Sequence, residues 1–387
     1  MQLIPVNDTN TTKEFLKVPI LINRGNPNWV RPIDDDINKI FDPKRNKLFR
    51  HGEAARWILK NDSGNLIGRV AAFLDKKKAF GEDQPTGGMG FFDCINDQTA
   101  ANTLFDVCKN WLAERQMEAM DGPINFGERN EWWGLLVEGF NMPTYNMNYN
   151  PKYYEQLFEN YGFQLYFNQY VYNYHVSDPI PEKYRDRAER IARNPQYTFE
   201  HLNKKYIDKY TEDFRNIYNE AWSKFYNVPP MEVHQSKALM KVIKPILEEE
   251  LMWFGYYDKK PVAFFLMLPD INPIINHLNG KLDLIGKLKF VYYRWSGKTR
   301  RMIGVLFGVT PDHQAKGVEG AIVMASAKVI QPMKKYDELE MNWIGDFNPK
   351  MIHLVDTVGG KLVRRYITYR KLFDASKPFN RHPIMNK

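Results

Sequence analysis

The chain has 387 residues, of which 43% are hydrophobic and 26% are charged, and its formal net charge is +8. This composition excludes a disordered or fibrous chain, allows two ordinary domains, and favours anionic partners. Two cysteines, Cys94 and Cys108, are too few for a disulfide scaffold and favour a reducing, cytoplasmic location.

The sequence gives no sign of a signal peptide or a membrane span. The first ten residues, MQLIPVNDTN, lack a basic region followed by an apolar run. The longest apolar run near the middle, Val262–Leu268, is too short to cross a bilayer. We therefore expect a protein without a membrane span.

The first half of the chain has the pattern of a hairpin followed by a strand and a helix. Residues 54–60 and 66–74 are predicted strands, and the turn-forming residues 61–65 (Asn-Asp-Ser-Gly-Asn) join them. Residues 89–95 are predicted to form an apolar strand and residues 99–116 an amphipathic helix. The half then closes with a strand over 119–126, a helix over 151–161 that ends at Gly162, and a strand over 165–176.

The second half is predicted to repeat this order of elements. Its expected elements are strand 197–202, helices 206–225 and 235–247, strands 251–257, 262–268 and 302–309, a helix from Val318 that stops at Pro332, strand 338–344, helix 349–358 and strand 362–369. A short match supports a duplication, because Asn-Pro-Lys opens both 150–153 and 348–351. We predict one domain over 1–178, a polar linker over 179–196 that contains prolines, and a second domain over 197–387.

A basic insertion lies between residues 281 and 301, with aromatic residues among its cations and a single acid, Asp283. Its members are Lys281, Lys287, Lys289, Phe290, Tyr292, Tyr293, Arg294, Trp295, Lys298, Arg300 and Arg301. One interpretation is an amphipathic helix with its charged face in water and its rings in the core. The other is a basic lip over an anionic ligand.

A strand, a tight loop and a helix follow in residues 302–330, and this segment is the strongest functional signal in the sequence. A loop that leads into a helix directs several unpaired backbone N–H groups at one point, which suits a phosphate. Gly317 lets the backbone approach an anion closely, while Lys316 and Gln314 offer a charge and a hydrogen-bond donor.

The order of elements in residues 197–371 resembles the GNAT superfamily of acyl-CoA N-acyltransferases. In that family the loop after the fourth strand reads Gln/Arg-x-x-Gly-x-Gly/Ala, and here it is Gln314-Ala-Lys-Gly317-Val-Glu319-Gly. The first half resembles a degenerate copy, in which residues 95–101 replace the glycine loop. The resemblance therefore implies a mixed α/β fold with two GNAT-like domains in tandem.

The resemblance also implies a co-substrate, acetyl-CoA or another acyl-CoA, whose pyrophosphate binds the loop amides. The implied contacts are Gln314, Ala315, Lys316, Gly317, Val318 and Glu319, together with a backbone N–H near Val309 for the thioester carbonyl and Asn348 at the start of the next helix. Two positions depart from the family pattern. Glu319 stands where the family has Gly or Ala, and Val355 stands where it often has Tyr.

Three residues are candidates for the chemistry of acyl transfer to an amine, which needs a base and an acid for the leaving thiolate. Glu340 and Asn342 share one face of the strand over 338–344, and Glu340 is the candidate base. Tyr369, with Tyr366 beside it in the last strand, is a candidate acid. Each of them also fits an ordinary role in a strand, as a hydrogen-bonded or packed side chain.

The loop over residues 125–134 is a second candidate recognition feature, since it is rich in charge, glycine and tryptophan. With Asn146, Asn148 and Tyr149 it could line a groove for an acceptor between the two halves. The alternative is a structural loop whose tryptophans fill the interface. The acceptor is expected to be a small-molecule or peptide amine.

Other functions stay open at the level of sequence. A non-catalytic binding protein fits Glu319 and Val355, and nucleic-acid binding through residues 281–301 would weaken steeply with salt. Transfer of an aminoacyl group from tRNA, as in the Fem peptidyltransferases, fits two GNAT-like halves, and tRNA is the one nucleic acid we consider as a partner. The histidines and cysteines lack metal-ligand spacing, so no metal is expected.

Overall fold

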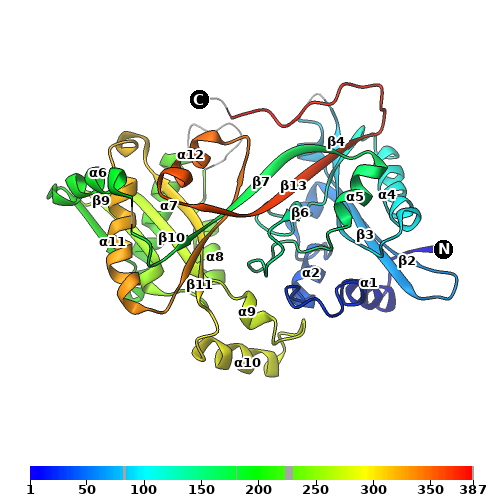
Figure 1. Cartoon of the computed structure of the whole chain (residues 1–387), viewed down its shortest axis with the longest axis horizontal. Coiled ribbons are helices and arrows are strands. Elements are labelled where there is room, and N and C mark those ends of the chain that lie inside the picture. The colour runs from blue at the N-terminus through cyan, green and yellow to red at the C-terminus, as the bar shows by residue number, and fades with distance from the viewer. Residues whose placement is uncertain (82–83, 180, 223–229, 386–387) are drawn as a thin grey trace.

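The computed structural model describes residues 1–81, 84–179, 181–222 and 230–385, and within these ranges a 13-stranded mixed sheet crosses the whole molecule (Figure 1). Helices cover the sheet on both sides of its long central strands (Figure 1). The mixed α/β fold predicted from the sequence is therefore confirmed.

The first half contains the hairpin, strands and helices predicted for it, preceded by elements that the sequence reasoning did not assign. Its elements are β1 Gln2–Pro5, α1 Thr9–Ile22, α2 Asp34–Ile40, β2 Gly52–Lys60, β3 Leu66–Asp75, α3 Lys76–Ala79, β4 Thr86–Cys94, α4 Gln98–Ala113, β5 Ala119–Gly122, β6 Leu135–Glu138, α5 Tyr154–Tyr161 and β7 Gln164–His175. The strand predicted over 119–126 is shorter than expected, because Pro123 offers no N–H to continue the ladder.

The second half follows the predicted order closely. Its elements are α6 Glu182–Arg193, β8 Tyr197–His201, α7 Ile207–Trp222, α8 Val233–Ile243, β9 Met252–Tyr257, β10 Lys260–Pro269, α9 Asn272–Ile275, α10 Leu284–Trp295, β11 Arg301–Val309, α11 Val318–Met333, β12 Glu338–Gly345, α12 Pro349–Thr357 and β13 Lys361–Leu372. The predicted helix over 206–225 corresponds to α7, and its residues 223–225 lie outside the described residues.

The segment predicted as a linker, residues 179–196, contains the helix α6. Its apolar Ala188 is fully buried and Ile191 packs on the core of the second half, so the helix has one inner face. Pro181 lies at the start of this helix and Pro195 follows its end, so neither proline interrupts it. The predicted linker is thus largely helical, and its helix packs on the second half.

The two halves exchange their closing strands. The strand order is β1-β2-β3-β4-β5-β13-β7-β12-β11-β10-β9-β8. β13, from the end of the chain, pairs with β5 of the first half, as Tyr369 does with Gly122. β7, from the first half, pairs with β12, as His175 does with Glu338. β7 and β13 therefore join the two halves into one continuous sheet (Figure 1).

The basic insertion forms the helix α10, as one interpretation of the sequence expected, but its rings are not all in the core. Phe290 packs against a small buried cluster that includes Ile275, and Tyr293 stacks on His277 with ring centroids 4.1 Å apart. Tyr292 and Trp295 point away from the protein and are exposed. The expectation of buried rings is wrong for these two, because only one narrow face of the helix meets the protein.

Candidate functional site

Each half has a pair of parallel strands that diverge. β4 pairs with β5 only from Thr86–Gly88 to Ala119–Asp121. β11 pairs with β12 only from Arg301–Gly304 to Glu338–Met341. Beyond these pairs the strands separate, and each opening is flanked by two helices, α4 and α5 in the first half and α11 and α12 in the second. A gap of this kind is where a substrate can meet backbone groups that no strand partner occupies.

Side chains fill the gap of the first half. The Cys94 backbone N–H donates to the Tyr154 hydroxyl (2.8 Å), and the Tyr153 hydroxyl donates to the Cys94 carbonyl (2.7 Å). Phe92 stacks on Phe105 with centroids 4.8 Å apart, and Phe158 meets both rings edge-on. The start of α5 thus packs closely against β4, and the space between them is too small for an extended ligand.

The gap of the second half is open and holds a cavity of about 370 Å³. This volume lies within the range of small-molecule pockets, roughly 300–1,000 Å³. The walls are mainly apolar and come from α11, α12 and four strands; they include Phe265, Met267, Met302, Phe307, Val323, Ala327, Ile330, Leu339, Met341, Met351, Leu354 and Val358, with polar side chains such as His175, Asp178 and Gln331 also present. An apolar cavity of this size suits a hydrocarbon chain.

The alternation of β12 decides which of its side chains reach this cavity. Leu339 and Met341 line it, so Glu340 and Asn342 point to the other face of the sheet. Glu340 is buried, and its two oxygens accept from Arg364 (2.7 Å) and Arg301 (3.1 Å). Both oxygens of this carboxylate are engaged by arginines, a geometry that favours a structural role over that of a base.

Asn342 lies further along β12, near the contact between the halves. Its side-chain oxygen accepts from the Thr144 hydroxyl at 3.3 Å, and the neighbouring Trp343 donates its ring N–H to the Arg129 carbonyl at 3.0 Å. Both partners belong to loops of the first half. Asn342 is half-buried there, which leaves its amide able to meet a ligand from that side.

Tyr369 lies in the aromatic core of the first half, because the exchange of strands carries the end of β13 there. It is buried among Phe158 and Phe163, and its hydroxyl donates to Glu159 at 3.2 Å. Burial raises the pKa of Tyr369. The tyrosine therefore belongs to the filled gap, in the opposite half from the loop before α11.

The loop before α11 has the backbone expected of an anion cradle. Gly317 has φ of +104° and Ala315 φ of +59°, and among the described residues no side chain caps the helix at Gly317. Gln314 folds back to donate to the Val309 carbonyl at 2.8 Å, and the Glu319 carboxylate accepts the Ala315 N–H at 3.2 Å. The Glu319 carboxylate thus binds one of the backbone N–H groups that the sequence analysis assigned to a phosphate.

The remaining predicted binding residues divide into exposed and structural positions. Lys316 is exposed beside the loop, whereas Val318 is buried in the core of the second half. Asn348 accepts the Met351 N–H at 3.3 Å and so caps α12. The helix α6 lies against the loop, since a Cβ placed on Gly317 would come within 3.0 Å of the Arg187 carbonyl oxygen. Arg187 itself is exposed there.

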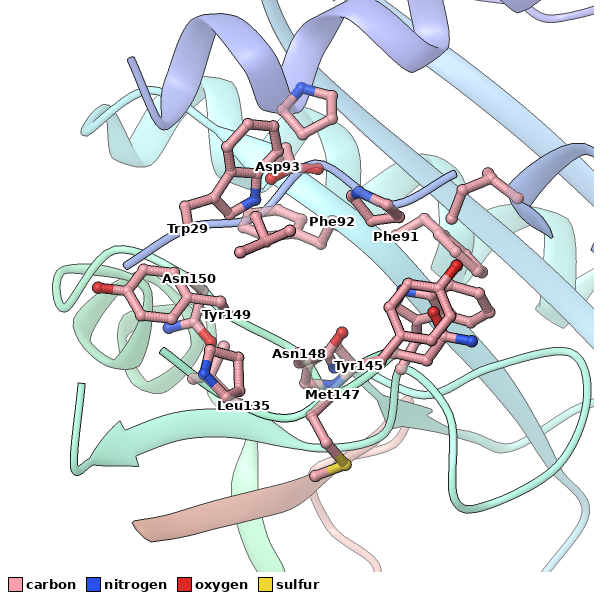
Figure 2. A pocket seen from close by; sticks show the side chains of 18 of the residues that line it. Trp29, Phe91, Phe92, Asp93, Leu135, Tyr145, Met147, Asn148, Tyr149 and Asn150 are labelled. Atoms are coloured by element: carbon pink, nitrogen blue, oxygen red, sulfur yellow. The ribbon is translucent and has the colours of Figure 1, made fainter. Parts of the chain in front are cut away.

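A second, smaller cavity of about 80 Å³ lies in the first half, where Figure 2 shows side chains from several loops around an open space. Asn146, Asn148 and Tyr149 line it, as the sequence proposed for an acceptor groove, and Asn272 reaches it from the second half. Its inner wall contains Asp93, which is buried and paired with Arg69 at 2.7 Å. The space suits a few waters or a small polar group rather than a chain.

The loop over residues 125–134 contributes to the contact between the halves. Trp132 lines the small cavity and Glu131 accepts from Asn146 at 3.2 Å. Asn125 is buried, and neither its side-chain oxygen nor its nitrogen has a partner among the described residues. The cavity that Trp132 lines is consistent with a recognition loop, and the contacts of the loop are consistent with a structural role, so both interpretations stay open.

The sequence reasoning missed the residues that β7 brings to the apolar cavity. Tyr174 and His175 line it, although they precede the second half in the chain. Tyr174 donates to the Val355 carbonyl at 3.0 Å, and His175 lies at the exposed end, with its Nδ1 3.2 Å from the Ser177 hydroxyl. Their position depends on the exchanged strand, for which the sequence carries no local signal.

Neither a metal centre nor a membrane-crossing helix emerges from the described residues. Within these ranges no group of three or more His, Cys, Asp or Glu side chains is arranged to hold a metal ion. None of the helices formed by the described residues combines the length and the apolar composition needed to cross a bilayer. The two cysteines are free thiols and both are buried.

Comparisons with known sequences find two related proteins that match nearly the whole chain. No protein-family model matches the chain. The chain is 27% identical over 383 residues to the bacterial ceramide synthase of Caulobacter vibrioides (strain NA1000 / CB15N), covering 96% of this chain and 97% of that protein. It is 25% identical over 372 residues to protein YghO of Escherichia coli (strain K12), covering 94% and 93% of the two chains.

Among solved structures, the chain is similar to a tandem GNAT protein from the clavulanic acid biosynthesis pathway. The TM-score is 0.55 at 10% sequence identity, and the match covers 97% of this chain and 99% of that one. A likeness at this identity concerns the course of the backbone alone. With its two splayed strand pairs and their flanking helices, the chain has the tandem GNAT fold.

Proposed function

We propose that this protein is an N-acyltransferase that moves a fatty acyl group from acyl-coenzyme A to the amine of a long-chain acceptor. The observation that carries the proposal is the apolar cavity between α11 and α12, at the point where β11 and β12 diverge. A thioester held at the divergence would place its acyl chain among these apolar side chains. An acetyl group, one of the acyl groups that the resemblance implied, needs no such cavity.

The similarity to a bacterial ceramide synthase over 96% of the chain supports the same class of reaction. A ceramide is the amide of a fatty acid and a long-chain amino alcohol. An acceptor of that kind offers a primary amine on a hydrocarbon chain, and an acyl-CoA offers the thioester. The choice of acceptor rests on this likeness and on the apolar cavity together.

The start of α11 is the proposed site for the phosphates of coenzyme A. The positive end of the helix dipole and its uncapped N–H groups favour an anion at this point. Lys316, and Arg187 on the adjoining α6, are the exposed cations within reach of the loop. Glu319 lies half-exposed on the Ala315 amide, and its carboxylate must turn away before a phosphate can take its place.

The exposed edge of β11 supplies the proposed support for the reacting carbonyl. Val305 is 45% exposed within a central strand; it is the extra residue of a bulge against β10, just beyond the point where pairing with β12 ends. Backbone N–H groups beyond Gly304 could hold the thioester oxygen as negative charge develops on it. The amine would enter from the opposite face, where Asn342 and Thr144 can orient it.

In the proposed step, the amine nitrogen attacks the thioester carbon and forms the amide bond. The carbon–sulfur bond then breaks, and one proton passes from the amine to the departing thiolate. Placing the two reactants in one orientation supplies much of the rate acceleration in such a transfer. Glu340 and Tyr369 take no part in this proposal, because their partners and positions hold them away from the open gap.

The test is calorimetry with acyl-CoAs of increasing chain length, followed by mass spectrometry of the amide formed with a long-chain amino alcohol. Each methylene buried in the cavity contributes about 0.8 kcal/mol, so affinity should rise about fourfold per methylene until the cavity is full. Ala327→Trp fills the cavity and should abolish this dependence on length. Lys328→Trp, on the solvent side of the same helix, is the matched control.

Two results would refute the proposal. Acetyl-CoA binding as tightly as a long-chain acyl-CoA would remove the role of the cavity. Tight, length-dependent binding without amide formation on a range of long-chain amines would leave a binding protein and exclude the transfer.

A further inference from the structure

The outer face of α10 is a continuous apolar stripe. Six large side chains on this helix, namely Leu284, Ile285, Leu288, Val291, Tyr292 and Trp295, are between 51% and 85% exposed. Their spacing follows the helical repeat of 3.6 residues, so they share one side of the helix. A contiguous exposed patch of this kind marks an interaction site.

The opposite face of α10 fixes the helix to the protein. Phe290 packs into the cluster around Ile275, Tyr293 stacks on His277, and Arg294 pairs with Glu248. Asp283 caps the start of the helix by accepting the Gly286 N–H at 2.8 Å. Figure 1 shows the helix at the edge of the molecule, beside α9. The apolar stripe is therefore presented outward on an anchored helix.

Lysines border the stripe on both sides. At about 100° per residue, Lys287 and Lys289 fall on its opposite margins, and Lys281 and Lys298 lie just beyond the two ends. All four are exposed, and none of them forms an ion pair with another described residue, whereas Arg294 and Arg300 do. Long lysine side chains can keep their charge in water while their stems cover apolar surface.

We propose that α10 docks this protein on an anionic lipid surface, with the apolar stripe among the acyl chains and the lysines at the headgroups. An apolar face bordered by lysines and containing tryptophan is the pattern of a helix that lies in the plane of a membrane interface. A second copy of the chain fits less well, because stripe-to-stripe packing would bring the same lysines together. A nucleic acid would engage the lysines and leave the stripe in water.

This surface is separate from the apolar cavity, since none of its side chains lines that cavity. The proposal therefore stands or fails independently of the proposed acyl transfer. It also gives the basic insertion a function that neither interpretation of the sequence contained.

The experiment is co-sedimentation of the full chain with vesicles of phosphatidylcholine alone or mixed with phosphatidylglycerol. Neither lipid has a primary amine, so neither can act as an acceptor. We expect binding to the mixed vesicles that weakens as salt screens the lysines. Leu288→Asp with Trp295→Asp should reduce partitioning about a hundredfold, because each buried large side chain contributes roughly tenfold.

Controls separate the stripe from general effects of charge and folding. Val242→Asp changes an exposed valine on α8, away from α10 in the sequence, and Lys13→Glu with Lys17→Glu reverses two exposed charges on α1; both should leave binding largely intact. Lys287→Glu with Lys289→Glu should weaken binding to the mixed vesicles, since each lysine near an anionic surface contributes about fivefold. Ala327→Trp should bind vesicles as the unchanged chain does.

Three outcomes would overturn the proposal. The first is no binding to either vesicle by folded protein. The second is equal loss in the Val242→Asp control. The third is a dimer in sedimentation velocity that the Leu288→Asp, Trp295→Asp variant converts to monomer while vesicle binding is unchanged.

Discussion

The two gaps of the sheet have the same framework and opposite contents. In the first half, Tyr154, Phe92 and Phe158 fill the space between α4 and α5. In the second half, the space between α11 and α12 is a cavity with apolar walls. A duplicated framework can thus keep one copy as a packed core and leave the other open for a ligand.

The helices that follow the two gaps, α4 and α11, differ in how their first N–H groups are capped. At α4, the Asp97 side chain accepts the Ala100 N–H at 2.8 Å and satisfies the helix start from within. At α11, Gly317 has no side chain, and the helix start keeps its N–H groups for another partner. The open gap and the uncapped helix occur together, which is why we place the co-substrate in the second half.

The largest effect is expected from Glu340, which lies on β12 beside the open gap. Glu340→Gln removes a buried charge that two arginines share, and breaking such a pair costs about 3–5 kcal/mol of unfolding free energy. Urea unfolding measures this loss of unfolding free energy, and Glu338→Gln on the same strand is the control. A catalytic base would behave differently, with a large fall in turnover and little change in stability.

Identical truncations in the two gaps should have unequal costs. Leu157→Ala on α5 removes a fully packed side chain, so it should cost about 2–5 kcal/mol of unfolding free energy. Leu354→Ala on α12 changes a half-buried side chain that already faces a cavity, so it should cost about 1 kcal/mol. Equal losses in denaturant unfolding would mean that the second gap is as densely packed as the first.

The smallest effect is expected from His313, in the loop before α11. The corresponding loop of the first half, before α4, has no histidine. Burial lowers its pKa, with a further contribution from Lys316, and its Nδ1 lies 2.6 Å from the Tyr197 hydroxyl. The folded protein therefore binds a proton at His313 less readily than the unfolded chain does. The free energy of unfolding should fall as the pH drops below about 6.5, the pKa of histidine in the unfolded chain. His313→Gln should flatten the unfolding free energy between pH 7 and 5; an unchanged slope would contradict this origin.

Local patterns in the sequence determined the elements and their order. Alternating apolar residues predicted β2, β3, β7 and β13, and helical periodicity predicted α4, α7 and α8, because these signals come from neighbours a few residues apart. The strand, tight loop and helix of residues 302–330 were predicted for the same reason. The tandem fold followed from the repeat of this order.

Only the tertiary structure decided which side chains meet. The exchange of β7 and β13 moved Tyr369 into the first half and brought His175 to the cavity of the second, although nothing near either residue signals it. Burial between two arginines set the environment of Glu340. The outward stripe of α10 likewise depends on which face meets the protein. Sequence fixes local propensity through short-range contacts, whereas pairing between distant strands and the choice of buried face depend on the whole packed chain.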